Sequence, residues 1–411
     1  MLVLGYINEE EESQMTSSNS VPEFKVGIVG PTRVGKTSLI AAVLQDSQHQ
    51  LAGSPVTLRP ANTGTEKRLS KYRRDLQGSF NAKELVFHSG ALAGTQEPFT
   101  FELTLTTGHS NTNINMHFLD FPGGWLDPEM RPDGRKADWE KCVEWINESS
   151  ILLIPIDATV LMEAEEARHK RLTPSLLAIP NVSDLVRDWA KIRQQQMDQP
   201  ALIVFCPLKC ESYFNDNGWG VRDGSKGLLS RIEHNYASVI EAVKKEAPHV
   251  QIRYCPIDTI GCVEIKKALW HENASLPSGY ELDVKYKIRT PAELRVKGAD
   301  SILLNICRQV MKVIETSEMQ KEKEAIDKAT HAKVAADQAR KIANEAGFFD
   351  RLSDWWNDKG WDHRKDMAGS AGSNAADKDK AAKEATASIN QLKAVMEILA
   401  NKPDDSRVVE L

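Results

Sequence analysis

A short glycine-rich stretch of the sequence carries the residue types that bind phosphate groups. An apolar run, Phe24–Val29, leads into a loop with the spacing GxxxxGKT, and an apolar helical pattern, Ser38–Leu44, follows it. Glycines let successive backbone amides turn toward a phosphate, and the helix N-terminus adds partial positive charge. The residues predicted to surround the phosphates are Gly30, Pro31, Thr32, Arg33, Val34, Gly35, Lys36, Thr37 and Ser38.

Two side chains of this loop have defined chemistry. The Lys36 ammonium is predicted to reach the β- and γ-phosphates, and the Thr37 hydroxyl is predicted to coordinate Mg²⁺. The alternative interpretation is a chance glycine turn with a surface lysine. The strand before the loop and the helix after it favour the phosphate site.

A second metal-side element follows the apolar run Ile114–Leu119. It is the segment Asp120-Phe121-Pro122-Gly123, in which Asp120 would hold Mg²⁺ through water and the Gly123 amide would contact the γ-phosphate. A DxxG segment alone is more often a simple turn. Its place at the end of a strand after the glycine-rich loop favours the metal-side interpretation.

A loop threonine should complete such a metal site. Thr95 lies four residues before the apolar run Phe99–Leu105, so its loop should pass the γ-phosphate. Thr63 and Thr65 lie more than thirty residues before that run, and Thr100 should already be inside the strand. Thr95 is therefore the predicted third metal-side residue, although such a threonine is usually a solvated loop hydroxyl.

The elements that must position these residues are short apolar runs alternating with helical patterns. The alternation predicts an α/β domain over residues 24–317, with a mostly parallel sheet flanked by helices. The predicted strands are Phe24–Val29, Phe99–Leu105, Ile114–Leu119, Ile151–Ile156, Ala201–Cys206 and Gln251–Cys255; the predicted helices include Trp139–Ile146, Ser183–Ile192, Leu228–Val243 and Ala299–Ile314.

Composition narrows the class of protein. The chain has 411 residues, 41% of them hydrophobic, and a net charge of −6, which argues against wholesale disorder and against a nucleic-acid-binding coat of positive charge. No apolar run reaches the ~18 residues of a membrane-spanning helix. No secretory signal is apparent, and the six cysteines form no CxxC pair, so we expect a cytoplasmic protein with free thiols.

The ends of the chain differ from its middle. Residues 1–23 contain five glutamates and no basic residue, which predicts an acidic disordered tail. In residues 318–400 an alanine seam with 4,3 spacing runs from Ala325 to Ala346 and predicts an antiparallel helical hairpin. The alternative is a single alanine-rich helix. Residues 401–411 are expected to form a tail.

Between the predicted arms of the hairpin lies an apolar helical face near residues 348–361. We expect this aromatic tip, or the hairpin itself, to contact a protein partner or to pack on the protein. A membrane contact is not favoured, because residues 348–364 carry four acidic and three basic side chains. The residues of the face are Phe348, Phe349, Leu352, Trp355 and Trp356.

The glycine-rich loop and the DxxG segment resemble those of GTPases of the translation-factor-related P-loop class, which includes Ras-like and dynamin-like proteins. The resemblance covers about residues 24–314 and implies a GTP/GDP site with Mg²⁺, GTP hydrolysis, and a nucleotide-dependent switch acting on a protein partner. The stretch Asp46–Gly94 and the segment 94–98 also resemble the double-GTPases of bacterial conflict systems.

The resemblance implies where a base would bind. The family pattern N/T-K-x-D is matched after the run Ala201–Cys206 only by Lys209, since Leu208 replaces Asn or Thr and Glu211 replaces Asp. Glutamate retains both acceptor oxygens, so guanine recognition by Lys209 and Glu211 is expected, and ATP stays an alternative. Asp258 lies where the family has a short base-contacting loop.

The resemblance also bears on hydrolysis. Ras-like members carry a water-orienting glutamine just after DxxG, and this position is Gly124 here. Guanylate-binding GTPases carry an arginine in the phosphate loop that acts in cis, which implies this role for Arg33. The predicted catalytic residues are thus Arg33, Lys36, Thr95 and Gly123, with Arg131 and Arg135 as further candidates.

Two other classes stay open. One is a nucleotide-binding module without hydrolysis, which the glycine at 124 supports. The other is a mechanical, membrane-associated GTPase of the dynamin-like kind, which would form nucleotide-dependent oligomers.

Overall fold

The computed structural model describes residues 23–316 and 394–411, apart from 55, 82–85, 89–93, 108–112, 198, 217–222, 275–278, 291, 313–314 and 395. The predicted acidic tail apart from Glu23, most of the helical hairpin and the aromatic tip therefore lie outside the described residues.

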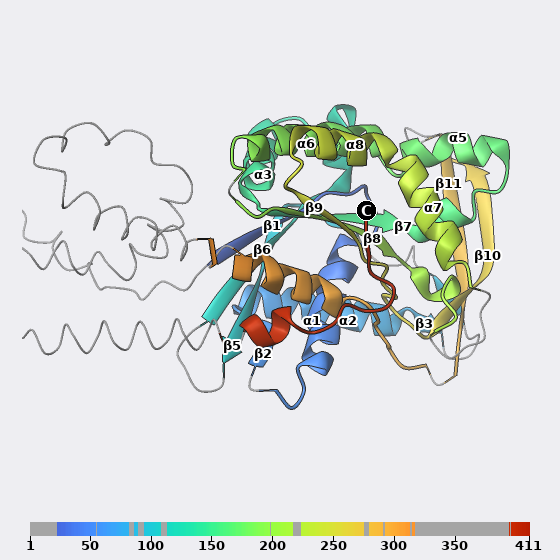
Figure 1. Ribbon diagram of the computed structural model, residues 1–411. Helices are drawn as coiled ribbons and strands as arrows, with labels where there is room; N and C mark the ends of the chain where they lie inside the picture. The colour runs from blue at the N-terminus through green and yellow to red at the C-terminus, as the bar shows by residue number, and fades with distance from the viewer. Residues whose placement is uncertain are drawn as a thin grey trace, which may run out of the picture.

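The described residues form an α/β domain around an eight-stranded sheet (Figure 1). Five neighbouring strands, β9, β8, β7, β1 and β6, run parallel, and β12, β5 and β2 add antiparallel edges. The predicted mostly parallel sheet is thus observed. In spatial order the strands are β12 (Val409–Glu410), β9 (Gln251–Tyr254), β8 (Leu202–Leu208), β7 (Ile151–Asp157), β1 (Glu23–Ile28), β6 (Asn113–Asp120), β5 (Phe99–Thr107) and β2 (Val56–Pro60).

Helices cover both faces of this sheet, as the uniformly apolar central strands require. Along β7, Ile151 and Leu153 join the core under α1, whereas Leu152, Ile154 and Ile156 join the core on the opposite face. One face carries α1 (Lys36–Gln50), α2 (Thr63–Gly78) and a helix over 300–312; the other carries α3 (Lys136–Glu148), α6 (Ile179–Gln194), α7 (Ser225–Asn235) and α8 (Ala237–Glu246).

A second, antiparallel sheet of four strands, which we did not predict, stands beside α5 (Ala167–Leu176) in Figure 1. In β11, Leu282, Val284, Tyr286 and Ile288 alternate with charged residues, a pattern typical of a strand with one buried face. The strand order is β10 (Val263–Glu272), β11 (Tyr280–Ile288), β4 (Val86–His88) and β3 (Phe80–Asn81).

The single helix predicted over Leu228–Val243 is wrong, because the chain forms α7 and α8 with a break at Tyr236. The Asn235 side-chain amide donates to the Arg231 carbonyl at 2.7 Å. This local bond competes with the helical ladder, which is how asparagine disfavours helix interiors.

The C-terminal residues pack on the α/β domain, in contrast to the tail that we expected at 401–411. Met396 and Leu399 are each 1% exposed and join the core that contains α1. Arg308 donates to the carbonyls of Ala400 and Lys402 and pairs with Asp404, and β12 then pairs with β9. The domain therefore extends to Leu411.

No helix among the described residues is long and apolar enough to cross a membrane.

Packing of the C-terminal helix can be tested with neighbouring residues. Leu399→Ala should lower the free energy of unfolding by about 2–5 kcal/mol, because it leaves a cavity in the core. Ile398 is 57% exposed, so Ile398→Ala should change the free energy of unfolding by no more than about 0.5 kcal/mol. Urea unfolding of both variants provides the measurement, and equal effects would contradict the packing.

Candidate functional site

The predicted phosphate loop lies between β1 and α1, which begins at Lys36. Gly35 has φ 107°, a left-handed conformation that glycine adopts without strain, and Arg33 adopts φ 61°. Val34 is 2% exposed and anchors the loop, while Thr32 and Arg33 are exposed. The sequence therefore yields the strand, loop and helix that the motif requires.

Lys36 lies across the inside of this loop. Its ammonium donates to the carbonyls of Gly30 at 3.0 Å and Pro31 at 3.2 Å. Burial lowers the pKa of Lys36 to about 8, and the nearby Asp120 acts in the opposite direction. An anionic phosphate at the loop would favour the charged form further.

The three predicted metal-side residues converge beside the loop. The Asp120 carboxylate accepts hydrogen bonds through Oδ2 from the Thr37 hydroxyl at 2.6 Å and the Thr95 hydroxyl at 2.8 Å. The two hydroxyls are 3.4 Å apart. Asp120 ends β6, Thr37 lies in the first turn of α1, and Thr95 lies in the loop before β5, so three separate elements supply this cluster.

This oxygen set fits Mg²⁺. Asp120 is fully buried, and its second oxygen, Oδ1, has no hydrogen-bond partner among the described residues. Within the described part of the chain, no group of three or more His, Cys, Asp or Glu residues could hold a metal by itself. Mg²⁺ does not need one, because it is commonly bound by one or two carboxylates together with waters and substrate phosphates.

Gly123 lies directly against the phosphate loop. A Cβ at this position would be 2.2 Å from the Pro31 carbonyl carbon and the Thr32 nitrogen, so a side chain is excluded. At Gly124 a Cβ would meet only the Thr32 hydroxyl at 3.4 Å and Met130 at 3.8 Å. The segment after Asp120 is therefore in contact with the loop through Gly123.

The Arg33 side chain reaches the second sheet. Its guanidinium is 3.1 Å from the Glu281 carboxylate of β11, and the Arg33 side chain is 63% exposed. Arg131 donates to the Trp125 carbonyl, and Arg135 pairs with Asp138 and Glu97. Each predicted arginine thus has a partner within the protein.

The predicted base-side residues occupy the ends of β8 and β9. Lys209 has φ 62° and pairs with Asp157 at the end of β7. Glu211 is 1% exposed, and its Oε1 accepts from the amides of Ile260 at 2.8 Å and Gly261 at 3.2 Å. Burial, reinforced by Asp258, raises the pKa of Glu211 to about 7.

Asp258 and Leu208 have surroundings that sequence reasoning did not foresee. The Asp258 side chain is 1% exposed and accepts from the Arg407 guanidinium at 3.0 Å. This arrangement gives Asp258 an internal partner, so the expectation that its side chain contacts a base gains no support. Leu208 is fully buried in β8.

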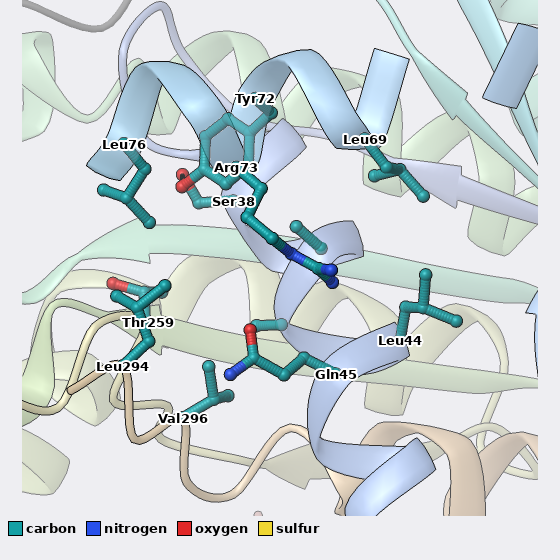
Figure 2. A pocket seen from close by; sticks show the side chains of 12 residues that line it. Ser38, Leu44, Gln45, Leu69, Tyr72, Arg73, Leu76, Thr259, Leu294 and Val296 are labelled. Atoms are coloured by element: carbon teal, nitrogen blue, oxygen red, sulfur yellow. Dashed lines mark hydrogen bonds between the residues drawn. The ribbon is translucent and has the colours of Figure 1, made fainter. Parts of the chain in front are cut away.

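Sequence reasoning also missed Tyr72 of α2. Its hydroxyl donates to the Ser38 hydroxyl at 2.8 Å, and burial raises the pKa of Tyr72 to about 12. Figure 2 shows Tyr72 across a small pocket from Thr259 and Leu294. The cavity is about 20 Å³, room for about one water molecule.

Comparisons with known proteins add little to this geometry. No protein-family model matches the chain, and no curated protein matches it significantly. It is similar to the crystal structure of Sup35 complexed with GDP, with 10% identity, a TM-score of 0.26, and coverage of 61% of this chain and 40% of that chain.

A second similar structure is Era in complex with MgGDPNP and nucleotides 1506–1542 of 16S ribosomal RNA. It shows 16% identity and a TM-score of 0.23, with 58% of this chain and 52% of that chain covered. The chain thus spans about half or less of these solved chains. Structural similarity at this level does not identify a function. The function must therefore be inferred from the site residues.

Neighbouring glycines allow a matched test of the Gly123 contact. If the loop binds GTP, as the resemblance implies, Gly123→Ala should weaken that binding by roughly tenfold or more, because overpacking of this kind costs about 1–3 kcal/mol. Gly124→Ala should retain the parent affinity, since its Cβ has room. Titration calorimetry measures both, and a Gly123→Ala protein with parent affinity would refute the contact.

Glu211 should make stability depend on pH. Its folded pKa lies above the usual 4.5, so its stabilising contribution is complete below about pH 4.5 and is lost as pH rises through about 7. The total is up to about 3 kcal/mol. Glu211→Gln cannot lose a proton, so its free energy of unfolding should fall less between pH 5 and 8. Urea unfolding at both pH values measures this change. An equal change in the free energy of unfolding for the parent and the variant would contradict the role of Glu211.

Proposed function

We propose that the protein binds GTP with Mg²⁺ at the loop 30–37, hydrolyses it, and acts as a nucleotide-dependent switch on a protein partner. The convergence of Thr37, Thr95 and Asp120 beside Lys36 is the observation that carries the proposal. These groups come from distant parts of the sequence. Their meeting at a phosphate loop supports a shared role in binding a triphosphate.

Each residue then has a defined task. The amides of the loop and the Lys36 ammonium bind the phosphates. Thr37, Thr95 and Asp120 would hold Mg²⁺, which neutralises charge on the β- and γ-phosphate oxygens when bound. The Thr95 loop and the segment from Asp120 to Gly123 are the two parts that would respond to the γ-phosphate, because both contact the phosphate loop.

Guanine recognition is proposed for Lys209 and Glu211. As a carboxylate, Glu211 would accept from the guanine ring N–H and amino group. Adenine is the alternative, because the buried Leu208 has no polar group where the family has Asn or Thr. Most of the proposed partner surface, the predicted hairpin at residues 318–400, lies outside the described residues. The absence of nucleic-acid binding and the cytoplasmic location stay predictions.

Arg33 is the proposed source of transition-state stabilisation. Its ion pair with Glu281 is exposed, and exposed pairs contribute only about 0–1 kcal/mol. The guanidinium can therefore leave Glu281 for a γ-phosphate at little cost.

The phosphate site can be tested by removing its charge and its hydroxyl. Lys36→Ala should weaken GTP and GDP binding by roughly 100-fold or more, and Thr37→Ala should abolish the Mg²⁺ dependence of GTP binding. Lys25→Ala is the matched control, because Lys25 pairs with Glu148. Parent-like nucleotide affinity in Lys36→Ala and Thr37→Ala would refute the proposed site.

The role of Arg33 is tested by single-turnover GTP hydrolysis. Arg33→Ala should slow the step by roughly 10³-fold or more, as expected for loss of an arginine finger. Glu281→Gln releases Arg33 without removing it and should keep or increase the parent rate. An Arg33→Ala protein that hydrolyses GTP at the parent rate would exclude the role.

A further inference from the structure

The last ten residues form an ordered segment along the base-side edge of the main sheet. We call residues 402–411 the C-terminal strap; it ends beside β9 and β8 in Figure 1. Val409 and Glu410 pair with Tyr254 and Arg253, and the Leu411 amide donates to the Ile252 carbonyl at 3.0 Å. Arg253 also pairs with Asp404 and Glu410 of the strap.

One side chain of the strap, Arg407, enters the interior. It is 2% exposed and binds two carboxylates, those of Asp216 and Asp258. Its Nε donates to Asp216 at 2.8 Å, its Nη2 donates to Asp258 at 3.0 Å, and its guanidinium lies 4.2 Å from the Phe214 ring centre. Lys297 also pairs with Asp216, at 2.8 Å.

These two carboxylates belong to the two segments on which base recognition is proposed. Asp216 follows Glu211 by five residues, after the end of β8. Asp258 lies in the segment that follows β9. The backbone amides of Ile260 and Gly261 in this segment donate to the Glu211 carboxylate. A continuous path of contacts therefore runs from Arg407 through Asp258 and the 258–261 backbone to Glu211.

The buried carboxyl groups on this path need a cation beside them. Asp258 and Glu211 are both buried, and Asp258 acts electrostatically on Glu211. Arg407 supplies a cation between Asp258 and Asp216. Without it, the buried Asp258 carboxylate would lose the cation that pairs with it while still acting electrostatically on the buried Glu211, which strongly disfavours the present arrangement.

We propose that Arg407 is a positioning residue for base recognition, so that selectivity for guanine over adenine depends on the C-terminal strap. The proposal rests on the proposed nucleotide site. This role of Arg407 differs from a general structural role because it concerns only the base side of the site. Among the contacts described above, Arg407 makes none to the phosphate loop or to the Thr37–Asp120–Thr95 cluster.

The test compares three ligands with Mg²⁺ present: GDP, ADP and inorganic tripolyphosphate. Arg407→Gln should weaken GDP binding by roughly tenfold, while ADP and tripolyphosphate affinities stay within about threefold of the parent values. Arg253→Gln is the matched control, because it removes ion pairs to the strap but leaves Asp258 and Arg407 paired. It should keep the parent ratio of GDP to ADP affinity.

A second variant covers the case in which Arg407→Gln does not fold. Asp258→Asn leaves Arg407 paired with Asp216 and removes one of the two buried charges, so we expect a folded protein with a lowered GDP to ADP ratio. Circular dichroism and thermal unfolding establish folding before titration calorimetry.

The outcomes separate the two proposals. Folded Arg407→Gln or Asp258→Asn proteins with the parent GDP to ADP ratio would overturn the positioning role, as would an equal loss of GDP and tripolyphosphate affinity. A parent protein that binds tripolyphosphate but neither nucleotide preferentially would instead refute the proposed guanine site.

Discussion

The buried Asp120 carboxylate beside the phosphate loop is the constraint on which the rest of the site depends. A carboxylate without solvent contact needs hydrogen bonds or a cation. Asp120 accepts hydrogen bonds from the hydroxyls of Thr37 and Thr95, and its charge acts to raise the pKa of Lys36. The end of β6, the start of α1 and the loop before β5 must therefore meet at one point. Parallel pairing of β1 with β6 places the first two together, and the antiparallel β5 returns the third to them.

The two ends of the proposed nucleotide site are built differently. The phosphate side centres on the contiguous loop 30–37, against which strand pairing places Asp120, Thr95 and Gly123. The base side depends on contacts between segments distant in sequence, in which Glu211 is held by the 260–261 amides and Asp258 by Arg407. We therefore expect the C-terminal residues to influence which base is bound without altering how phosphates are bound.

Sequence reasoning was more successful for the phosphate side of the site than for the base side. The structure brings Asp120 and Thr95 together beside loop 30–37, and their proximity could be expected from sequence because the spacing of a local motif and the ends of strands determine it. The partners of Arg33 and Asp258 could not be predicted, since Glu281 lies in an unforeseen sheet and Arg407 is 149 residues from Asp258. Packing of 401–411 was missed because a segment this short carries no periodic apolar pattern from which a strand could be predicted. Its strand β12 is only two residues long.

The central claim is that this cluster and loop bind a Mg²⁺-associated guanine nucleotide. It is tested by titration calorimetry of the parent protein with GTP, with and without Mg²⁺, and with GDP or ADP as competitor. We expect saturable binding of GTP that Mg²⁺ strengthens, and we expect ADP to displace GTP at least about tenfold less effectively than GDP does. Absence of GTP binding, or binding of equal strength with and without Mg²⁺, would contradict the account.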